Sequence, residues 1–167
     1  MMTRKDKENY YLDIAETVLK RSTCQRRNYG AIIVLNDEII ATGYNGAPRG
    51  RKNCLDIGRC TRDVMEVPSG ERYELCRSVH AETNAIISAA RRDMIGATLY
   101  LSGRDAKTGD LLEDTTPCLM CRRQIINAGI VKTICRVGDD DTYLITNTRD
   151  WVFNDDSLAG MPNEIAE

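Results

Sequence analysis

Apolar and polar residues recur along the chain with two different periods, which divide it into helices and strands. Residues 6–21 carry apolar side chains at helical spacing and predict an amphipathic helix. Two apolar runs rich in β-branched residues follow at 30–35 and 38–42, and the Asn36-Asp37 pair between them is typical of a two-residue hairpin turn. The sheet is therefore expected to begin with an antiparallel pair.

Helix and strand patterns alternate in the second half of the chain. Helical periodicity returns over 79–92, a short strand is expected at 98–101, and Pro117 stands where prolines open helices. Further strands are expected at 130–137 and 143–146. Crossover helices would make the later strands parallel and would cover both faces of the sheet. The predicted fold is α/β, with three α-β-α layers and a mixed sheet of about five strands.

Composition and charge narrow the class of protein. The 167 residues carry a net charge of −2, with 42% hydrophobic and 29% charged residues, as in globular proteins. No run is long enough to span a membrane and no signal-peptide pattern is present, so a cytoplasmic location is expected. The near-neutral charge gives no support to a nucleic-acid binder. We interpret residues 1–167 as one domain with a cysteine-rich insert at about 47–78 and an extended loop at about 102–116.

Seven cysteines and a single histidine carry the candidate chemistry. In a reducing compartment an odd number of cysteines favours metal ligands or a reactive thiol over disulfides. His80 and Glu82 begin one predicted helix, while Cys118 and Cys121 begin the next and share a face there. One imidazole and two thiolates leave a coordination position open, as in catalytic zinc sites. A carboxylate two residues from the histidine suits a base beside the metal.

Other interpretations of these motifs exist. A lone histidine is commonly a structural residue, and a C-x-x-C pair at a helix start also occurs in thioredoxin-like redox proteins. Pro117 before the first cysteine, and the position of the only histidine two residues before Glu82, favour the zinc site.

The remaining cysteines have no standard metal-binding spacing. Three of them lie in the 47–78 segment, which has no periodicity and needs something local to organise it. A zinc ion with four thiolate ligands would organise the segment, because metal binding contributes directly to the free energy of folding. The alternative is that some are small buried hydrophobes, as Cys135 in a predicted strand is expected to be. The four candidates for a second, structural zinc are Cys24, Cys54, Cys60 and Cys76.

Several motifs together resemble the cytidine and deoxycytidylate deaminase superfamily, and most closely the bacterial deoxycytidylate deaminases of the late-competence type. The H-x-E and P-C-x-x-C pair is the zinc deaminase signature. The similarity extends from residue 22 to about 137. The matching segments are Ser22-Thr-Cys24, Gly30-Ala-Ile-Ile-Val34, Gly43-Tyr-Asn-Gly46, His80-Ala-Glu82 with Asn84-Ala-Ile86, and Pro117-Cys-x-x-Cys121 with Ala128-Gly-Ile130.

The resemblance implies zinc-dependent hydrolytic deamination of deoxycytidylate (dCMP) to deoxyuridylate (dUMP) in pyrimidine deoxynucleotide metabolism. Glu82 would move the protons. Cysteines, or a histidine among them, surround a second zinc at matching places in the relatives, and here all four ligands would be cysteine. Asn45 would hold the sugar, the backbone of Ala81 and Thr116 the pyrimidine edge, and Arg26 the phosphate. The alternatives for the phosphate contact are Arg27, Arg49 and Arg91.

The resemblance also implies a homo-oligomer, a dimer or a hexamer, with possible control by deoxynucleoside triphosphates. Two other functions compete with this interpretation. One is a deaminase of the same fold acting on another nucleoside, nucleobase or nucleotide, such as cytidine or guanine. The other is a zinc-binding module without catalytic activity. The 102–116 loop is longer than in the relatives and ends beside the expected zinc ligands. Its length therefore affects the expected shape of the substrate pocket and, with it, the choice of substrate.

Overall fold

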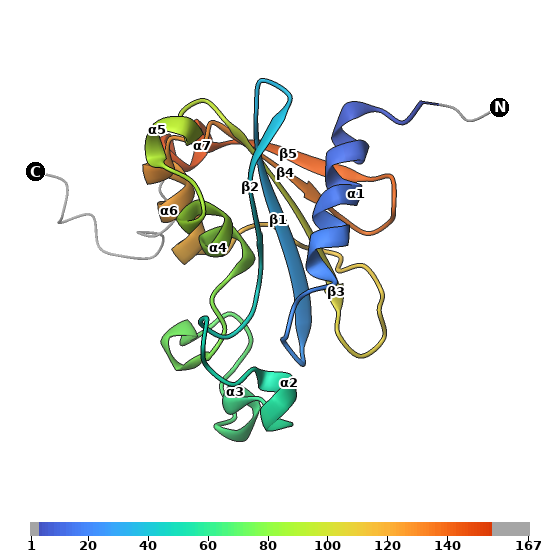
Figure 1. Ribbon diagram of the computed structural model, residues 1–167, viewed down its shortest axis with the longest axis vertical. Coiled ribbons are helices and arrows are strands. Elements are labelled where there is room, and N and C mark those ends of the chain that lie inside the picture. Colours follow the sequence, from blue (N-terminus) through green and yellow to red (C-terminus); the bar gives the residue numbers. More distant parts are fainter. Residues whose placement is uncertain (1–3, 155–167) are drawn as a thin grey trace, which may run out of the picture.

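A five-stranded mixed sheet forms the centre of the computed structural model, which describes residues 4–154. The strand order is β2-β1-β3-β4-β5, and helices cover both faces (Figure 1). This confirms the predicted three-layer α/β fold. The strands are β1 (Arg27–Leu35), β2 (Glu38–Tyr44), β3 (Thr98–Asp105), β4 (Lys132–Arg136) and β5 (Tyr143–Asn147).

The first two strands form the predicted hairpin. Asn36 and Asp37 have φ angles of 51° and 65°, the left-handed conformation that a tight two-residue hairpin turn requires. β1 also pairs antiparallel with β3, and β3 pairs parallel with β4. The expectation of parallel later strands fails at β5, which is antiparallel to β4. The six residues between these two strands are too few for a crossover helix, so the chain turns back as a hairpin.

The two faces of the sheet hold separate cores. Helix α1 (Lys7–Leu19) packs on one face, where Leu12 contacts a cluster that includes Ile32. The next residue along β1, Ile33, points to the opposite face and joins the core beneath the other helices. The helices of this second face are α4 (Ala81–Ile87), α5 (Arg91–Met94) and α6 (Leu119–Ala128).

Three helical features differ from the sequence prediction. The stretch 79–92 forms two short helices, α4 and α5, instead of one. Pro117 precedes the N-cap of α6, which is Cys118, and does not occupy the first helical turn. Helix α7 (Thr148–Phe153) follows β5, where no helix is predicted.

Two glycines let helices approach the sheet closely. A Cβ atom on Gly30 would lie 2.1 Å from the Ala15 carbonyl oxygen of α1. A Cβ atom on Gly43 would lie 2.3 Å from the Ala81 carbonyl oxygen of α4. Both contacts are with backbone, so a side chain would force the helix away. Gly43 therefore fixes the first turn of α4 against the end of β2.

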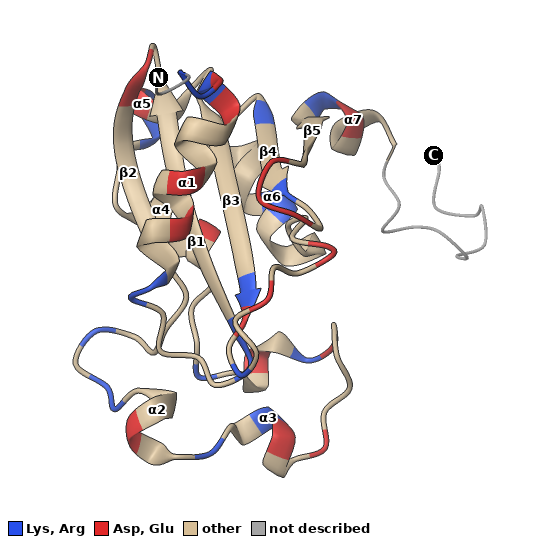
Figure 2. Cartoon of the chain, turned by 90° about the vertical axis from the view of Figure 1, so that its right-hand side faces the viewer, with Lys and Arg blue, Asp and Glu red and all other residues tan. Residues whose placement is uncertain are grey.

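The cysteine-rich segment, residues 47–78, packs at the end of the sheet where β1 begins and β3 ends (Figure 1). It contains α2 (Cys54–Ile57), α3 (Thr61–Val64) and a short 3-10 helix, η1 (Tyr73–Leu75). Several lysines and arginines lie in the loops of this end of the molecule (Figure 2). No helix within residues 4–154 is long and apolar enough to cross a membrane.

The extended loop 102–116 begins as a continuation of β3. The Asp105 amide donates to the Asp110 carbonyl, and the backbones of Arg104 and Leu111 form an isolated antiparallel β-bridge. Residues 107–110 therefore form a hairpin tip. The loop then returns to the beginning of α6.

Candidate active site

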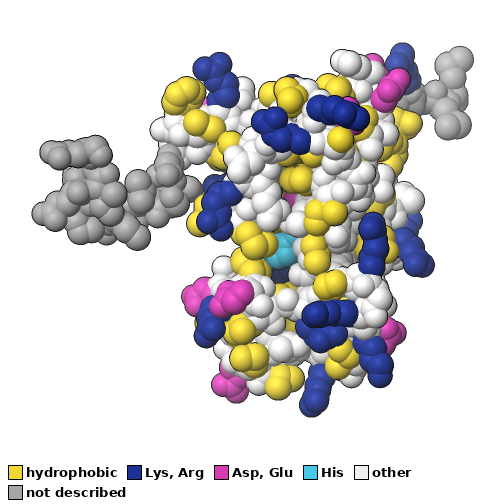
Figure 3. Space-filling model, turned by 60° about the vertical axis from the view of Figure 1, so that its left-hand side comes forward, with side chains coloured by type: hydrophobic (Ala, Val, Ile, Leu, Met, Phe, Trp, Pro, Cys, Tyr) yellow, Lys and Arg dark blue, Asp and Glu magenta, His cyan; other side chains and the backbone are white. Residues whose placement is uncertain are grey.

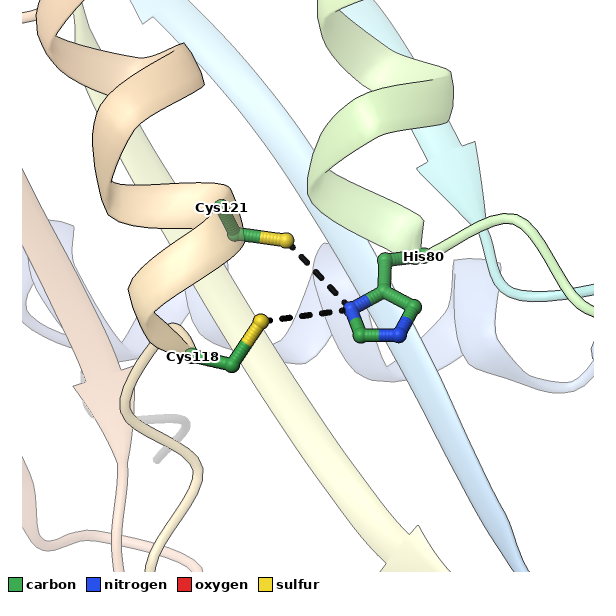
Figure 4. Close-up of side chains that lie close together, drawn as sticks. All are labelled: His80, Cys118 and Cys121. Carbon is green, nitrogen blue, oxygen red and sulfur yellow. Dashed lines mark hydrogen bonds between the residues drawn. The ribbon is translucent and has the colours of Figure 1, made fainter. Parts of the chain in front are cut away.

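Two helix starts bring the predicted metal ligands together. His80 is the N-cap of α4 and Cys118 is the N-cap of α6, while Cys121 lies in the first turn of α6. Their side chains point toward one another from the two helices (Figure 4). The positive ends of both helix dipoles face the group and favour negatively charged sulfur.

The spacing of the three ligand atoms fits zinc. The His80 Nδ1 atom lies 3.6 Å from the Cys118 sulfur and 3.3 Å from the Cys121 sulfur. All three atoms lie within 4.8 Å of one another. A tetrahedral zinc ion with bonds of about 2.1 Å to nitrogen and 2.3 Å to sulfur places such ligands about 3.6 Å apart. The donor set and the spacing therefore suit zinc with one coordination position left open.

Burial and hydrogen bonding perturb the titration of this site. Glu82 is buried, and desolvation raises the pKa of its carboxyl above the usual range. Hydrogen bonds from Cys121 and His80 lower the pKa of the Cys118 thiol. The site therefore combines a group that readily forms a thiolate with a carboxyl that can hold a proton closer to neutral pH.

A cavity of about 290 Å³ opens beside this group. His80, Glu82 and Cys118 line it from the sheet side, and Tyr73 lines it from the cysteine-rich segment. In Figure 3 the histidine lies at the bottom of an opening between the sheet and that segment. Sequence reasoning missed Tyr73, because the segment that carries it shows no periodic pattern.

The structure brings the four predicted substrate contacts to this cavity: Asn45, Ala81, Thr116 and Arg26 all line it. Ala81 is fully buried at the start of α4. The backbone N–H of Thr116 donates to the Asp114 carboxylate at 2.8 Å. Asp114 lines the cavity as well and is a residue that sequence reasoning missed.

The Asn45 side chain forms three hydrogen bonds within the protein. Its Oδ1 atom accepts from the Ser22 hydroxyl at 2.6 Å and from the Tyr29 amide at 2.7 Å. Its Nδ2 atom donates to the Arg27 carbonyl at 2.8 Å. The side chain thereby joins the end of β2 to the start of β1, which leaves less hydrogen-bonding capacity for a ligand than the prediction assumes.

The candidate phosphate ligands separate into two groups. Arg26 and Arg27 line the cavity, and Arg26 forms an ion pair with Asp63 of α3 at 3.3 Å. Arg49 and Arg91 do not line it, and Arg91 donates instead to the carbonyl of Asn127 near the C-terminal end of α6.

The four other candidate ligands also line this cavity: Cys24, Cys54, Cys60 and Cys76. Burial raises the pKa of the Cys54 thiol, and the charges of Cys24, Cys76 and Cys60 raise it further. Within residues 4–154, however, only the His80 group has three ligand atoms within 4.8 Å of one another. Cys135 is buried in β4, as predicted.

Comparisons with known proteins agree with this geometry. The family model described as the cytidine and deoxycytidylate deaminase zinc-binding region matches residues 5–137. The deoxycytidylate deaminase of Mycobacterium phage D29 is 36% identical over 137 residues, which cover 80% of the chain and 96% of the phage protein. The deoxycytidylate deaminase of Schizosaccharomyces pombe is also 36% identical, over 76% of the chain, but the chain spans only 36% of its length.

A solved structure is similar as well. The crystal structure of dCMP deaminase from the cyanophage S-TIM5, in complex with dCMP and dUMP, has a TM-score of 0.55 and 25% sequence identity, over 81% of this chain and 85% of that one. The fold and the ligand set define a zinc-binding protein of the α/β class. Within that class, the chain belongs to the cytidine and deoxycytidylate deaminase family.

Proposed function

We propose that the protein catalyses the hydrolytic deamination of dCMP to dUMP, with zinc held by His80, Cys118 and Cys121. One observation carries the proposal. The buried Glu82 carboxyl lies beside three zinc-ligating atoms in a cavity that Arg26 also lines. The names of two relatives, each 36% identical, support dCMP as the substrate.

Glu82 is the proposed proton carrier. When bound, zinc lowers the pKa of a coordinated water to about 7 and so makes a nucleophile available near neutral pH. The Glu82 carboxylate can take one proton from the attacking water and deliver it to N3 of the cytosine ring, and can then take the proton of the hydroxyl group added at C4 and deliver it to the departing amino group. Its raised pKa suits both roles, because the protonated and ionised forms are then closer in free energy at neutral pH.

The polar groups of the cavity suit the other parts of a nucleotide. The backbone at Ala81 and Thr116 lies near the metal ligands and would bind the pyrimidine edge, while Asn45 would contact the sugar through its remaining N–H. Arg26 is the proposed phosphate ligand, with Arg27 as the neighbouring alternative. A guanidinium suits phosphate because it donates two parallel hydrogen bonds.

A second, structural zinc bound by the four cysteines is also part of the proposal. Backbone N–H groups two residues further along donate to the sulfurs of Cys24 and Cys76, both at 3.4 Å. Hydrogen bonds of this kind stabilise thiolates that bind metal. Purified protein should contain two zinc ions per chain, whereas one zinc per chain would disprove the second site.

The substrate is tested by ammonia release from a panel of amino-bearing compounds. The panel contains dCMP, CMP, deoxycytidine, cytidine and guanine, each offered to zinc-loaded protein at the same concentration. We expect dCMP to be deaminated with the highest kcat/KM. Turnover of cytidine or guanine without turnover of dCMP would favour a different deaminase of this fold. No turnover of any compound would favour a zinc-binding module.

Quaternary structure, location and regulation follow only from the resemblance and stay predictions. We propose a cytoplasmic homo-oligomer, a dimer or a hexamer, whose activity is controlled by deoxynucleoside triphosphates. Light scattering coupled to gel filtration measures the mass. Assays with and without dCTP and dTTP measure the regulation.

A further inference from the structure

Three side chains form a stack that runs from the cysteine-rich segment to the first metal ligand. The guanidinium carbon of Arg62 lies 5.0 Å from the centroid of the Tyr73 ring. The Tyr73 ring in turn meets the His80 ring edge to face, with centroids 4.9 Å apart and planes at 89°. Both distances fall in the range of favourable cation–π and aromatic contacts.

The cysteine-rich segment determines where this tyrosine lies. Arg62 of α3 is only 6% exposed and donates to the carbonyl oxygens of Pro68 and Glu71, both at 2.6 Å. These two bonds tie α3 to the turn that precedes η1, and Arg62 also covers Tyr73. Tyr73 is therefore held between a buried cation and the imidazole.

Tyr73 also lies close to the reacting region. Tyr73 and His80 line the same cavity. The tyrosine is thus near enough to affect both the imidazole and a ligand in the cavity.

We propose that Tyr73 is a positioning residue, which fixes the orientation of the His80 imidazole and narrows the cavity beside it, and that Arg62 acts through Tyr73. The cysteine-rich segment then forms part of the active site instead of a separate structural unit. The effect on turnover rests on the proposed function, whereas the effect on the imidazole does not.

The chain has one histidine, so NMR of histidine-labelled protein reports on His80 alone, provided that no histidine tag remains. We expect zinc-loaded wild-type protein to give one sharp set of imidazole signals. Tyr73→Leu should shift and broaden these signals, because a ring in a fixed edge-to-face contact has been replaced by a side chain that does not orient the imidazole. Tyr73→Phe keeps the ring and should preserve a single sharp set.

Turnover rates and a variant of Arg62 provide the second part of the test. We expect Tyr73→Leu to lower kcat for dCMP by roughly tenfold or more while zinc stays bound, as for other residues that orient metal ligands. Arg62→Met should produce the same change in the imidazole signals in weaker form. The double variant should be no worse than Tyr73→Leu, because Arg62 acts through the tyrosine. Tyr10→Leu, at an exposed tyrosine of α1, is the matched control.

The outcomes separate this inference from the proposed function. If Tyr73→Leu leaves the His80 signals sharp and turnover within twofold of wild type, Tyr73 does not position the ligand. Additive effects of Arg62→Met and Tyr73→Leu would overturn the role of Arg62. If wild-type protein does not deaminate dCMP but the imidazole signals change as expected, the proposed function fails and the positioning role stands. Should Tyr73→Leu not fold, Tyr73→Met, which also removes the ring but fills more of its space, provides the same NMR test.

Discussion

The Thr83 hydroxyl donates a hydrogen bond of 2.6 Å to the side-chain oxygen of Gln124. Thr83 belongs to α4 and Gln124 to α6, so this contact joins the two helices whose first turns carry the metal ligands. The same hydroxyl lies 4.0 Å from the Cys121 sulfur. The separation between His80 and the cysteines therefore depends on this pair as well as on apolar packing.

Removing that hydrogen bond should weaken metal binding. We expect Thr83→Val, which keeps the shape of the side chain, to lower zinc affinity by roughly tenfold or more, as outer-shell changes at metal sites commonly do. Gln124→Leu should have a similar effect, and the double variant should show less than the sum of the two. Competition with a chromophoric chelator measures the affinity. Full additivity would show that the two residues do not act as a pair.

The charge of Glu82 can be removed with little change in volume. We expect Glu82→Gln to reduce kcat at least about 100-fold, because proton transfer by a positioned carboxyl contributes that much. Zinc content should stay at the wild-type level, because Glu82 is not one of the three ligands. Glu66→Gln, at an exposed glutamate, is the control. Loss of zinc together with activity would instead assign Glu82 to the metal ligands.

The sequence predicts the pair of cysteine ligands and the first hairpin well because local geometry determines both. Cys118 and Cys121 share a helix face through their spacing, and the Asn36-Asp37 turn fixes the register of the first hairpin. The position of Tyr73 against His80 has no such local signal, because tertiary packing of a non-periodic segment brings the two rings together.

Strand direction and polar burial were equally difficult to predict. β5 runs antiparallel to β4 because the connection between them is short. Hydrophobic periodicity predicts the strands but not their relative direction. Arg136 gave no signal at all, because an arginine in a strand normally faces solvent. In the fold its side chain is fully buried beneath α1.

The buried Arg136 side chain joins β4 to α1 through hydrogen bonds. It donates to Asn9 at 2.7 Å and to the Asp13 carboxylate at 2.6 Å, and it also bonds the Asp140 carbonyl. Asp13 is half exposed, so solvent screens that ion pair. We expect Arg136→Met to lower the free energy of unfolding by about 2 kcal/mol, mainly through the buried acceptors left without a donor. Urea denaturation measures this change, and Arg92→Met at an exposed arginine should leave it unchanged.

Asn45 should matter for stability as well as for substrate binding. Asn45→Ala removes three hydrogen bonds from a buried site and leaves the Tyr29 amide without its acceptor. We expect a loss of about 2–3 kcal/mol in unfolding free energy. Asn45→Asp keeps the acceptor for Tyr29 and should recover part of the loss. A variant as stable as wild type would contradict the hydrogen-bonding role described here.

The seven cysteines should differ sharply in reactivity once metal is removed. Hydrogen bonds lower the pKa of Cys118, whereas burial raises the pKa of Cys135. Only the thiolate reacts with alkylating reagents, so at about pH 8 Cys118 should be modified quickly and Cys135 should stay protonated and unmodified. Peptide mass spectrometry after a timed pulse of iodoacetamide on chelator-treated protein measures both rates.

A matched variant and a denaturant step complete this test. Cys118→Ser should abolish the fastest modification, and unfolding in urea should make Cys135 reactive, because its protection comes from the folded sheet. Protection of Cys118 in zinc-loaded protein would show that metal occupies its sulfur. Equal rates at Cys118 and Cys135 in folded protein would mean that chelation opens the sheet itself, and the metal would then be required for the whole fold and not for the site alone.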